Sequence, residues 1–106
     1  MDKTTFNAAM QAMSKDCGTT KFNIDLNSYE SDSLIPKIAG GWLNSVYVND
    51  NNVFIAILNK GYTFAYLADD FDEEELEQIF EEVYYHFMSE EEFGSAEEYL
   101  SKCVAK

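Results

Sequence analysis

The stretch WLNSVYVNDNNVFIAILNKGYTFAYLA, residues 42–68, decides the fold of this chain. Aromatic, aliphatic and β-branched residues dominate it, and they fall into three runs, 42–49, 53–58 and 62–68. Runs of this length and composition predict β-strands. Short turn sequences separate them, Asp50-Asn51-Asn52 and Asn59-Lys60-Gly61, and Gly61 is free to adopt the positive φ of a tight turn. Strands joined by such short turns form an antiparallel meander.

The sequence before the meander predicts a helix and one further strand. Over residues 6–17, apolar side chains recur at steps of three and four, which makes one apolar stripe. Thr4 or Thr5 is the expected N-cap, and Gly18 suits the left-handed position after the last turn. Residues 19–27 then alternate between apolar and polar, which indicates a half-buried strand.

The sequence after the meander predicts two more helices. From 76 to 87 the apolar residues fall within about 100° of a helical wheel, and Asp70 or Asp72 is the expected N-cap. A last helix is expected over 95–104. Residues 28–41, between the early strand and the meander, contain Pro36 and a Gly-Gly pair, and are expected to form a loop.

These elements predict one α+β domain spanning residues 1–106. It consists of an N-terminal helix, an antiparallel sheet of three or four strands in a meander, and two C-terminal helices packed on one face. Apolar residues make up 46% of the chain, too many for a disordered tail. No run of 18 apolar residues and no signal-peptide pattern is present, so no membrane contact is expected. Two cysteines without metal spacing indicate a reducing compartment, a cytoplasmic location.

The net charge of −13 is concentrated in one half of the chain. Residues 1–60 hold six carboxylates and five lysines, whereas residues 61–106 hold fourteen carboxylates and two lysines. Between Gly61 and Leu100 there is no Lys or Arg. Because an acidic domain repels nucleic acid and is attracted to basic surfaces, the expected partner is a basic protein, and direct nucleic-acid binding is not expected.

The acidic residues around the helix of 76–87 form the candidate binding surface. Carboxylates three and four residues apart on a helix lie roughly 5–6 Å from each other, a spacing comparable to that of successive phosphates. The expected partner-binding residues are Asp69, Asp70, Asp72, Glu73, Glu74, Glu75, Glu77, Glu81, Glu82, Glu90, Glu91, Glu92 and, as an aromatic anchor, Tyr85. A solvated, solubilising face is the alternative interpretation of such a charge run, although here no Lys interleaves the acids.

Catalytic, metal and cofactor sites are not expected. His86 is the only histidine, and it lies on an acid-rich helix away from any nucleophile in the sequence, so a Ser-His-Asp or Cys-His mechanism has no support. A calcium-binding loop that starts at Asp70 lacks the glycine needed for its sharp turn, and one that starts at Asp50 fails at Phe54. The sequence therefore favours a binding protein over an enzyme.

Residues 51–104 resemble a family of small acidic inhibitors from phages and other mobile elements, the anti-CRISPR and antirestriction proteins that imitate DNA. The resemblance is greatest to the short type II-A anti-CRISPR that occupies the site where the effector nuclease reads its adjacent DNA motif. That fold runs helix, three-stranded sheet and two helices with a tight hairpin, and here the stretch Glu90-Glu91-Glu92-Phe93 matches it literally. The loop 28–41 and the strand 42–49 depart from the pattern. The resemblance implies a stoichiometric inhibitor of a DNA-binding nuclease.

Two other functions fit the same composition. One is an immunity protein that neutralises a basic nuclease toxin, and the other is a plain acidic module that binds a basic cellular protein. The sequence leaves open the choice among these functions, the identity of the target and the oligomeric state.

Overall fold

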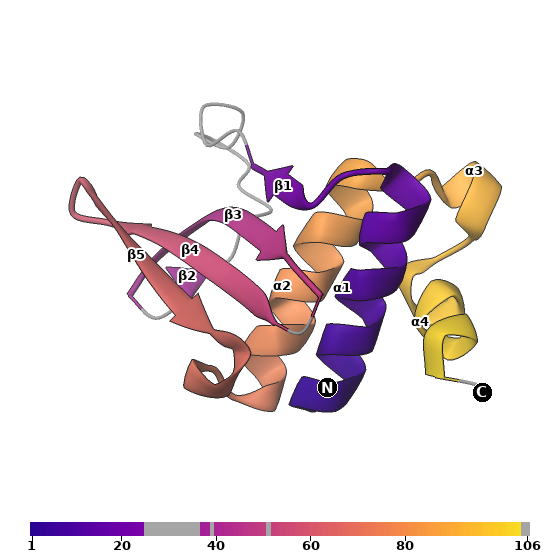
Figure 1. The fold of residues 1–106 in the computed structure, drawn as a ribbon, viewed down its shortest axis with the longest axis horizontal. Helices are drawn as coiled ribbons and strands as arrows, with labels where there is room; N and C mark the ends of the chain where they lie inside the picture. Colours follow the sequence, from indigo (N-terminus) through magenta and orange to yellow (C-terminus); the bar gives the residue numbers. More distant parts are fainter. Residues whose placement is uncertain (25–36, 39, 51, 105–106) are drawn as a thin grey trace.

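The computed structural model describes residues 1–24, 37–38, 40–50 and 52–104, and it confirms the α+β class (Figure 1). The elements in chain order are α1 (Lys3–Cys17), β1 (Lys21–Asn23), β2 (Lys37–Ile38), β3 (Gly41–Val48), β4 (Val53–Asn59), β5 (Tyr62–Leu67), the 3-10 helix η2 (Ala68–Asp70), α2 (Glu73–Phe87), α3 (Glu90–Phe93) and α4 (Ala96–Val104).

The sheet is antiparallel throughout, with the strand order β1-β3-β4-β5, and β3, β4 and β5 form the predicted meander. The strand β2 is a difference from the sequence prediction, which had a loop over 28–41. Lys37 and Ile38 pair with Trp42 and Gly41 of β3, and Ile38 is fully buried. Two residues are too few to show any periodicity, so this strand has no signal in the sequence. Residues 28–36 and 39 of that loop, and 25–27 of the predicted early strand, lie outside the described residues.

The turn between β4 and β5 is a tight two-residue loop. It contains two residues, Lys60 with a φ of 53° and Gly61 with a φ of 84°, and it closes on the pair Asn59–Tyr62. Two positive φ values in a two-residue loop define a type I′ turn, whose twist matches that of the flanking strands. The predicted positive φ at Gly61 is therefore confirmed.

Local capping sets the helix ends. The predicted N-cap of α1 at Thr4 or Thr5 is wrong, because Asp2 takes this role and its Oδ1 accepts a hydrogen bond of 2.7 Å from Thr5 N. Asp and Thr side chains can both accept the capping hydrogen bond, so the residue types alone do not show which of these neighbours is the N-cap. At the other end, Gly18 adopts the predicted left-handed conformation, with a φ of 68°.

The helix α2 begins at one of its two predicted caps. The Asp72 side chain accepts a hydrogen bond from Glu75 N, and the Glu75 side chain accepts one from Asp72 N, which completes a capping box. A similar reciprocal pair joins Ser95, the residue before α4, to Glu98 in the first turn of that helix.

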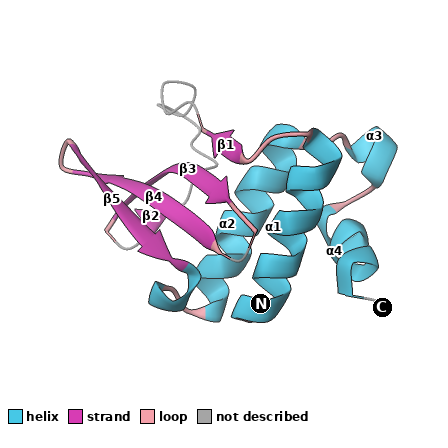
Figure 2. Cartoon of the chain, viewed as in Figure 1, coloured by secondary structure: helices cyan, strands magenta, loops and turns pink. Residues whose placement is uncertain are grey.

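The molecule is layered, with the sheet on one side and α1 and α2 side by side against it (Figure 2). The core is formed by apolar side chains of all three, among them Phe6, Met10, Met13, Phe22, Leu43, Val46, Ile55, Ile57, Leu76, Ile79, Phe80 and Val83. The helix α4 packs against α1 on the side away from the sheet (Figure 2). A hydrogen bond of 2.5 Å from the Tyr99 hydroxyl to Asp16 joins α4 to α1. The helix α4 therefore lies close to both α1 and α2.

Candidate functional site

The structure gathers part of the predicted acidic surface on α2 and α4. Because Leu76, Phe80 and Val83 of α2 face the core, the carboxylates one turn apart on the opposite side of the helix are exposed to solvent. We call the acidic face the set Glu74, Glu77, Glu81 and Tyr85 of α2 together with Glu97 of α4.

Glu97 enters this surface through helix packing. The pKa of Glu81 is raised, first by partial burial and then by the negative charges of Glu77 and Glu97. The acidic run of the sequence extends to Glu97, but sixteen positions separate this residue from Glu81, so the sequence does not show that the two lie together. The position of α4 beside α2 brings the three carboxylates into one cluster.

No described lysine neutralises the acidic face. Among the described side chains one lysine–carboxylate ion pair occurs, between Lys3 and Asp69 at 2.6 Å, and neither residue belongs to the acidic face. Like charges held close without counter-charges repel one another and reduce the stability of the fold. A basic partner that binds this surface would therefore relieve the repulsion.

Most of the predicted site residues around the start of α2 have structural partners. Asp69 pairs with Lys3, and Asp70 accepts a hydrogen bond of 2.9 Å from the backbone N–H of the last residue of β5. Asp72 and Glu75 form the capping box. Glu73 and Glu74 are exposed in the first turn, where the helix dipole favours negative charge. Most of these carboxylates therefore shape the start of α2 as well as adding charge.

Glu82 does not lie on the open surface, which corrects the sequence prediction for this residue. Its side chain is 11% exposed, and its Oε2 has no hydrogen-bond partner and lies 3.7 Å from Nδ1 of His86. Burial, with a smaller contribution from the charge of Glu81, raises the pKa of Glu82 to about 7. A helical wheel gives the direction of a side chain around its own helix and does not show what covers it, so the sequence could not reveal this burial.

A second group of acids surrounds α3. Glu90, Glu91 and Glu92 are exposed on this short helix. Burial, then the neighbouring Tyr85 and the charges of Glu90 and Glu98, raise the pKa of Tyr84. These two carboxylates therefore lie close to the same buried ring, one from α3 and one from α4.

Two tyrosines hold the segment that carries these acids. Tyr84 is fully buried and donates a hydrogen bond of 2.6 Å to the carbonyl of Gly94. Tyr85 is 47% exposed, and its hydroxyl accepts a hydrogen bond of 3.3 Å from Ala96 N at the start of α4. Tyr85 is therefore part of the acidic face and also helps to fix the start of α4, which carries Glu97.

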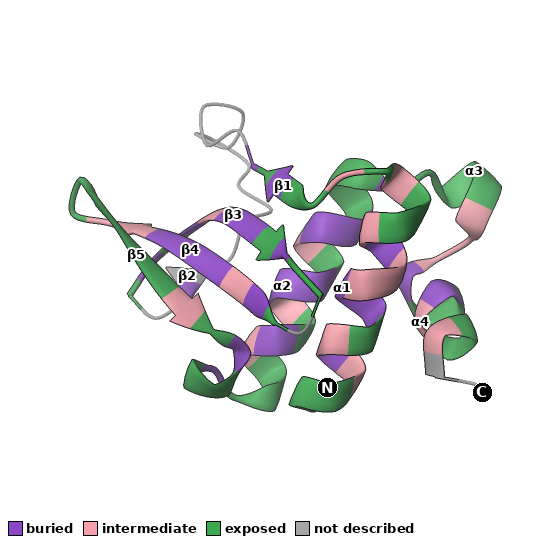
Figure 3. Cartoon of the chain, in the orientation of Figure 1, coloured by how far each residue is buried: buried purple, intermediate pink, exposed green. Residues whose placement is uncertain are grey.

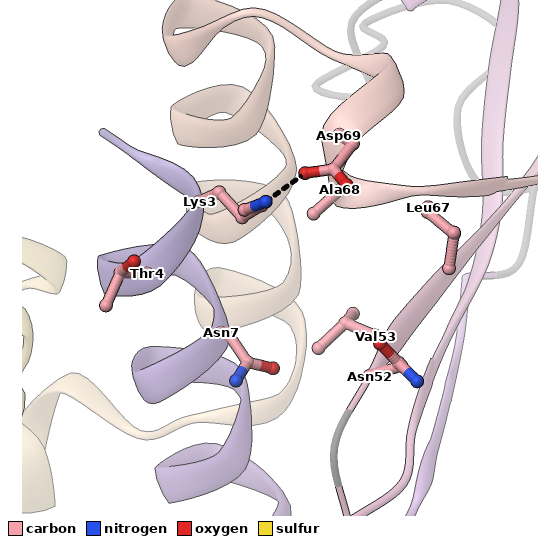
Figure 4. Close-up of a pocket in the computed structure, with 8 residues that line it drawn as sticks. All are labelled: Lys3, Thr4, Asn7, Asn52, Val53, Leu67, Ala68 and Asp69. Carbon is pink, nitrogen blue, oxygen red and sulfur yellow. Dashed lines mark ion pairs between the residues drawn. The ribbon is translucent and has the colours of Figure 1, made fainter.

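Other kinds of site find little support. Within the described ranges, no group of three or more His, Cys, Asp or Glu side chains is arranged to hold a metal ion. A pocket of about 290 Å³ lies between α1, the start of β4 and the end of β5 (Figure 4). The charged groups that line it, Lys3 and Asp69, are paired with each other. No helix in the described part of the chain is long and apolar enough to span a bilayer.

Comparison with models of protein families, with curated proteins and with solved structures found no match to this chain. The function is therefore inferred from the chemistry of its surfaces.

Proposed function

We propose that this protein is a stoichiometric inhibitor whose acidic face takes the place of nucleic-acid phosphates in the basic cleft of a DNA-binding nuclease. The observation that carries the proposal is the cluster of Glu77, Glu81 and Glu97, which two helices bring together with no described lysine to neutralise it. Such a surface supplies negative charge in a rigid arrangement that Arg and Lys side chains recognise.

The spacing of the acidic face supports phosphate mimicry. Glu74 lies three residues before Glu77, which lies four before Glu81, so neighbouring carboxylates project from α2 roughly 5–6 Å apart. A basic cleft evolved to follow a phosphate backbone meets charges at a comparable interval. Complementary charge accelerates the encounter and selects the partner.

Relief of self-repulsion gives the complex an additional driving force. The free protein carries a net charge of −13, and an Arg- and Lys-rich cleft supplies the counter-charges that its own sequence lacks. Tyr85, exposed beside these carboxylates, adds an aromatic contact of the kind that is enriched at binding hot spots. The mechanism uses no catalytic residue, metal or cofactor, and we place it in the cytoplasm of a bacterial host.

The test is capture of the target from bacterial lysate at moderate salt. We expect the purified protein to retain a DNA-binding nuclease that added DNA displaces, and the triple variant Glu74→Lys, Glu77→Lys, Glu81→Lys to retain none of it. Retention of the nuclease by the triple variant would contradict the proposal. Capture of a basic toxin that DNA does not displace would instead indicate an immunity protein.

A matched pair of single variants separates the acidic face from overall charge. Glu81→Lys and Asp50→Lys change the net charge equally, and both residues are exposed, but Asp50 lies in the turn after β3. We expect Glu81→Lys to weaken nuclease binding at least about tenfold, the effect of a lost interfacial charge pair, and Asp50→Lys to change it much less. Equal losses would mean that net charge alone drives the binding.

A further inference from the structure

Within the part of the chain that the structure describes, no strand pairs with the outer edge of β5. The strand order places β5 at the end of the sheet, where its single described neighbour is β4. Its six residues, Tyr62–Leu67, contain no charge and no proline, and its pairing with β4 has no bulge. Five of them are exposed (Figure 3), including Tyr62 at 71% and Phe64 at 46%. Natural edge strands are normally protected by charges, prolines or bulges, so an edge without them is suited to pairing with another strand.

The hairpin geometry shows which backbone groups are available. Because the type I′ turn closes on Asn59–Tyr62, the alternation of an antiparallel ladder directs the N–H and C=O groups of Tyr62, Phe64 and Tyr66 toward β4. Those of Thr63, Ala65 and Leu67 then point to the open edge. The hydrogen bond from Leu67 N to Asp70 agrees with this direction and occupies that donor. Thr63 and Ala65 therefore each present one donor and one acceptor.

We infer that this edge pairs with β5 of a second copy of the protein, antiparallel about a two-fold axis at Phe64. In this register Thr63 of each copy exchanges two backbone hydrogen bonds with Ala65 of the other, and Leu67 N stays bonded to Asp70. A register shifted by two residues and centred on Ala65 would pair Thr63 with Leu67, whose donor is already used. The free backbone groups thus favour the register centred on Phe64 over the one centred on Ala65.

The side chains match this register. It places Phe64 opposite Phe64 of the second copy, and Tyr62 opposite Tyr66 of the second copy. All three share one face of β5, because they alternate along the strand. Directly opposed aromatic side chains are among the favourable cross-strand pairs. The pairing therefore places against each other the side chains of a face on which Tyr62 and Phe64 are exposed in the single chain.

Charge explains why a second copy is the fitting partner. No acidic residue occurs between 51 and 68, so two copies can pair along β5 without carboxylates on the paired strands. Lys60 precedes β5, whereas Asp69 and Asp70 follow it. Antiparallel pairing brings the lysine of each copy to the acidic end of the other strand, which makes the edge self-complementary, as a two-fold interface requires.

This pairing leaves the acidic face free. The helix α4, which carries Glu97, lies at the opposite end of the long axis from the tip of the β4–β5 hairpin (Figure 1). The proposed dimer does not depend on the proposed inhibitor function, because the two use different surfaces. One can fail in experiment while the other holds.

Sedimentation equilibrium of the full chain tests the association. We expect a concentration-dependent monomer–dimer equilibrium between about 1 and about 500 µM. Phe64→Lys, which opposes two like charges at the axis, should weaken the dimer at least about tenfold. Tyr47→Lys is the matched control, since Tyr47 is 40% exposed on β3, a strand that pairs with β1 on one side and β4 on the other, and it should leave the dimer intact. A monomer throughout this range, or a Phe64→Lys dimer as stable as the unmodified one, would overturn the inference.

Engineered cysteines test the register independently of Phe64→Lys. In a chain with Cys17 and Cys103 replaced by alanine, Phe64→Cys should form an intermolecular disulfide on mild oxidation, because opposed residues of a non-hydrogen-bonded pair have Cα atoms about 4.5 Å apart. Tyr62→Cys is more exposed, but its two copies would lie about 14 Å apart and should not cross-link. Equal cross-linking at both positions, or none at Phe64→Cys, would overturn this register.

Discussion

The β4–β5 hairpin and the C-terminal helices are consecutive in the chain, yet their surfaces have opposite chemistry. The hairpin, residues 53–67, contains one lysine and no acid, and it exposes aromatic rings and backbone groups. Residues 69–98 contain fourteen acids and no lysine. Both regions contribute to the same core, through Ile55 and Ile57 on one side and Ile79 and Phe80 on the other. One apolar interior therefore supports two surfaces that suit different partners.

The comparison shows where stability and recognition are separated. Apolar packing holds the acidic helices in place although their charges repel one another. The exposed faces contribute little to folding, and for this reason they are free to carry a charge pattern or an open strand edge. Variants in the apolar core and on the exposed faces measure how far stability and recognition depend on different residues.

The largest expected effect comes from the shared core. Phe80→Ala removes a ring that is 2% exposed and should lower the free energy of unfolding by about 3–5 kcal/mol. Phe64→Ala, at the open edge, should cost less than about 1 kcal/mol. Urea denaturation followed by circular dichroism measures both variants. Similar losses would show that the hairpin surface is part of the folding core.

A smaller and pH-dependent effect is expected at Glu82. Its pKa is raised from 4.5 to about 7 in the folded protein, so the folded state favours the protonated form. The stabilisation is present below pH 4.5 and is lost as the pH rises through about 7, since a charge must then be held in a desolvated site.

Glu82→Gln removes this pH dependence. At pH 8 the variant should be more stable than the unmodified protein by about 1–2 kcal/mol, an estimate reduced from the full shift because solvent still reaches the carboxylate. At pH 4.5 the two should be equally stable. Glu74→Gln, at an exposed position of the same helix, serves as the control and should not share this dependence. A gain of equal size at both pH values would contradict the desolvation argument.

The hairpin turn should show an effect of about 1 kcal/mol. Gly61 has a φ of 84°, so Gly61→Ala places a Cβ in the left-handed region and should destabilise the protein by about 1 kcal/mol. Lys60→Gly relieves the same kind of strain at a φ of 53° and should not destabilise the turn. Thermal unfolding measures both. A neutral Gly61→Ala variant would mean that the turn does not hold its type I′ geometry.

The smallest effect is expected from a single charge of the acidic face. Glu77→Gln removes repulsion with Glu81 and should stabilise the protein by a few tenths of a kcal/mol at low salt. The gain should vanish near 1 M NaCl, where the Debye length is about 3 Å. Asp50→Asn is the control, because Asp50 lies outside the cluster. A loss of stability in Glu77→Gln would show that this carboxylate has a structural partner.

The elements of this fold with strong local signals could be predicted from the sequence. The apolar residues of α1, of α2 and of the three meander strands each follow a pattern that extends over many residues. The capping residues Gly18 and Asp72 act within one turn of their helices. The strand β2 and the Asp2 cap were missed. The first is too short to show a pattern, and the second depends on a choice among neighbouring residues of similar chemistry.

The sequence by itself determined how the charge is divided along the chain and which residues of each helix are apolar. Only the tertiary structure decided which charges meet and which are covered. It brings Glu97 to Glu81, pairs Lys3 with Asp69, and removes most of Glu82 from solvent. The physical reason is that composition and periodicity are local properties, whereas contacts and desolvation depend on how whole helices pack. The sequence of a helix shows only the direction in which each side chain points around its axis.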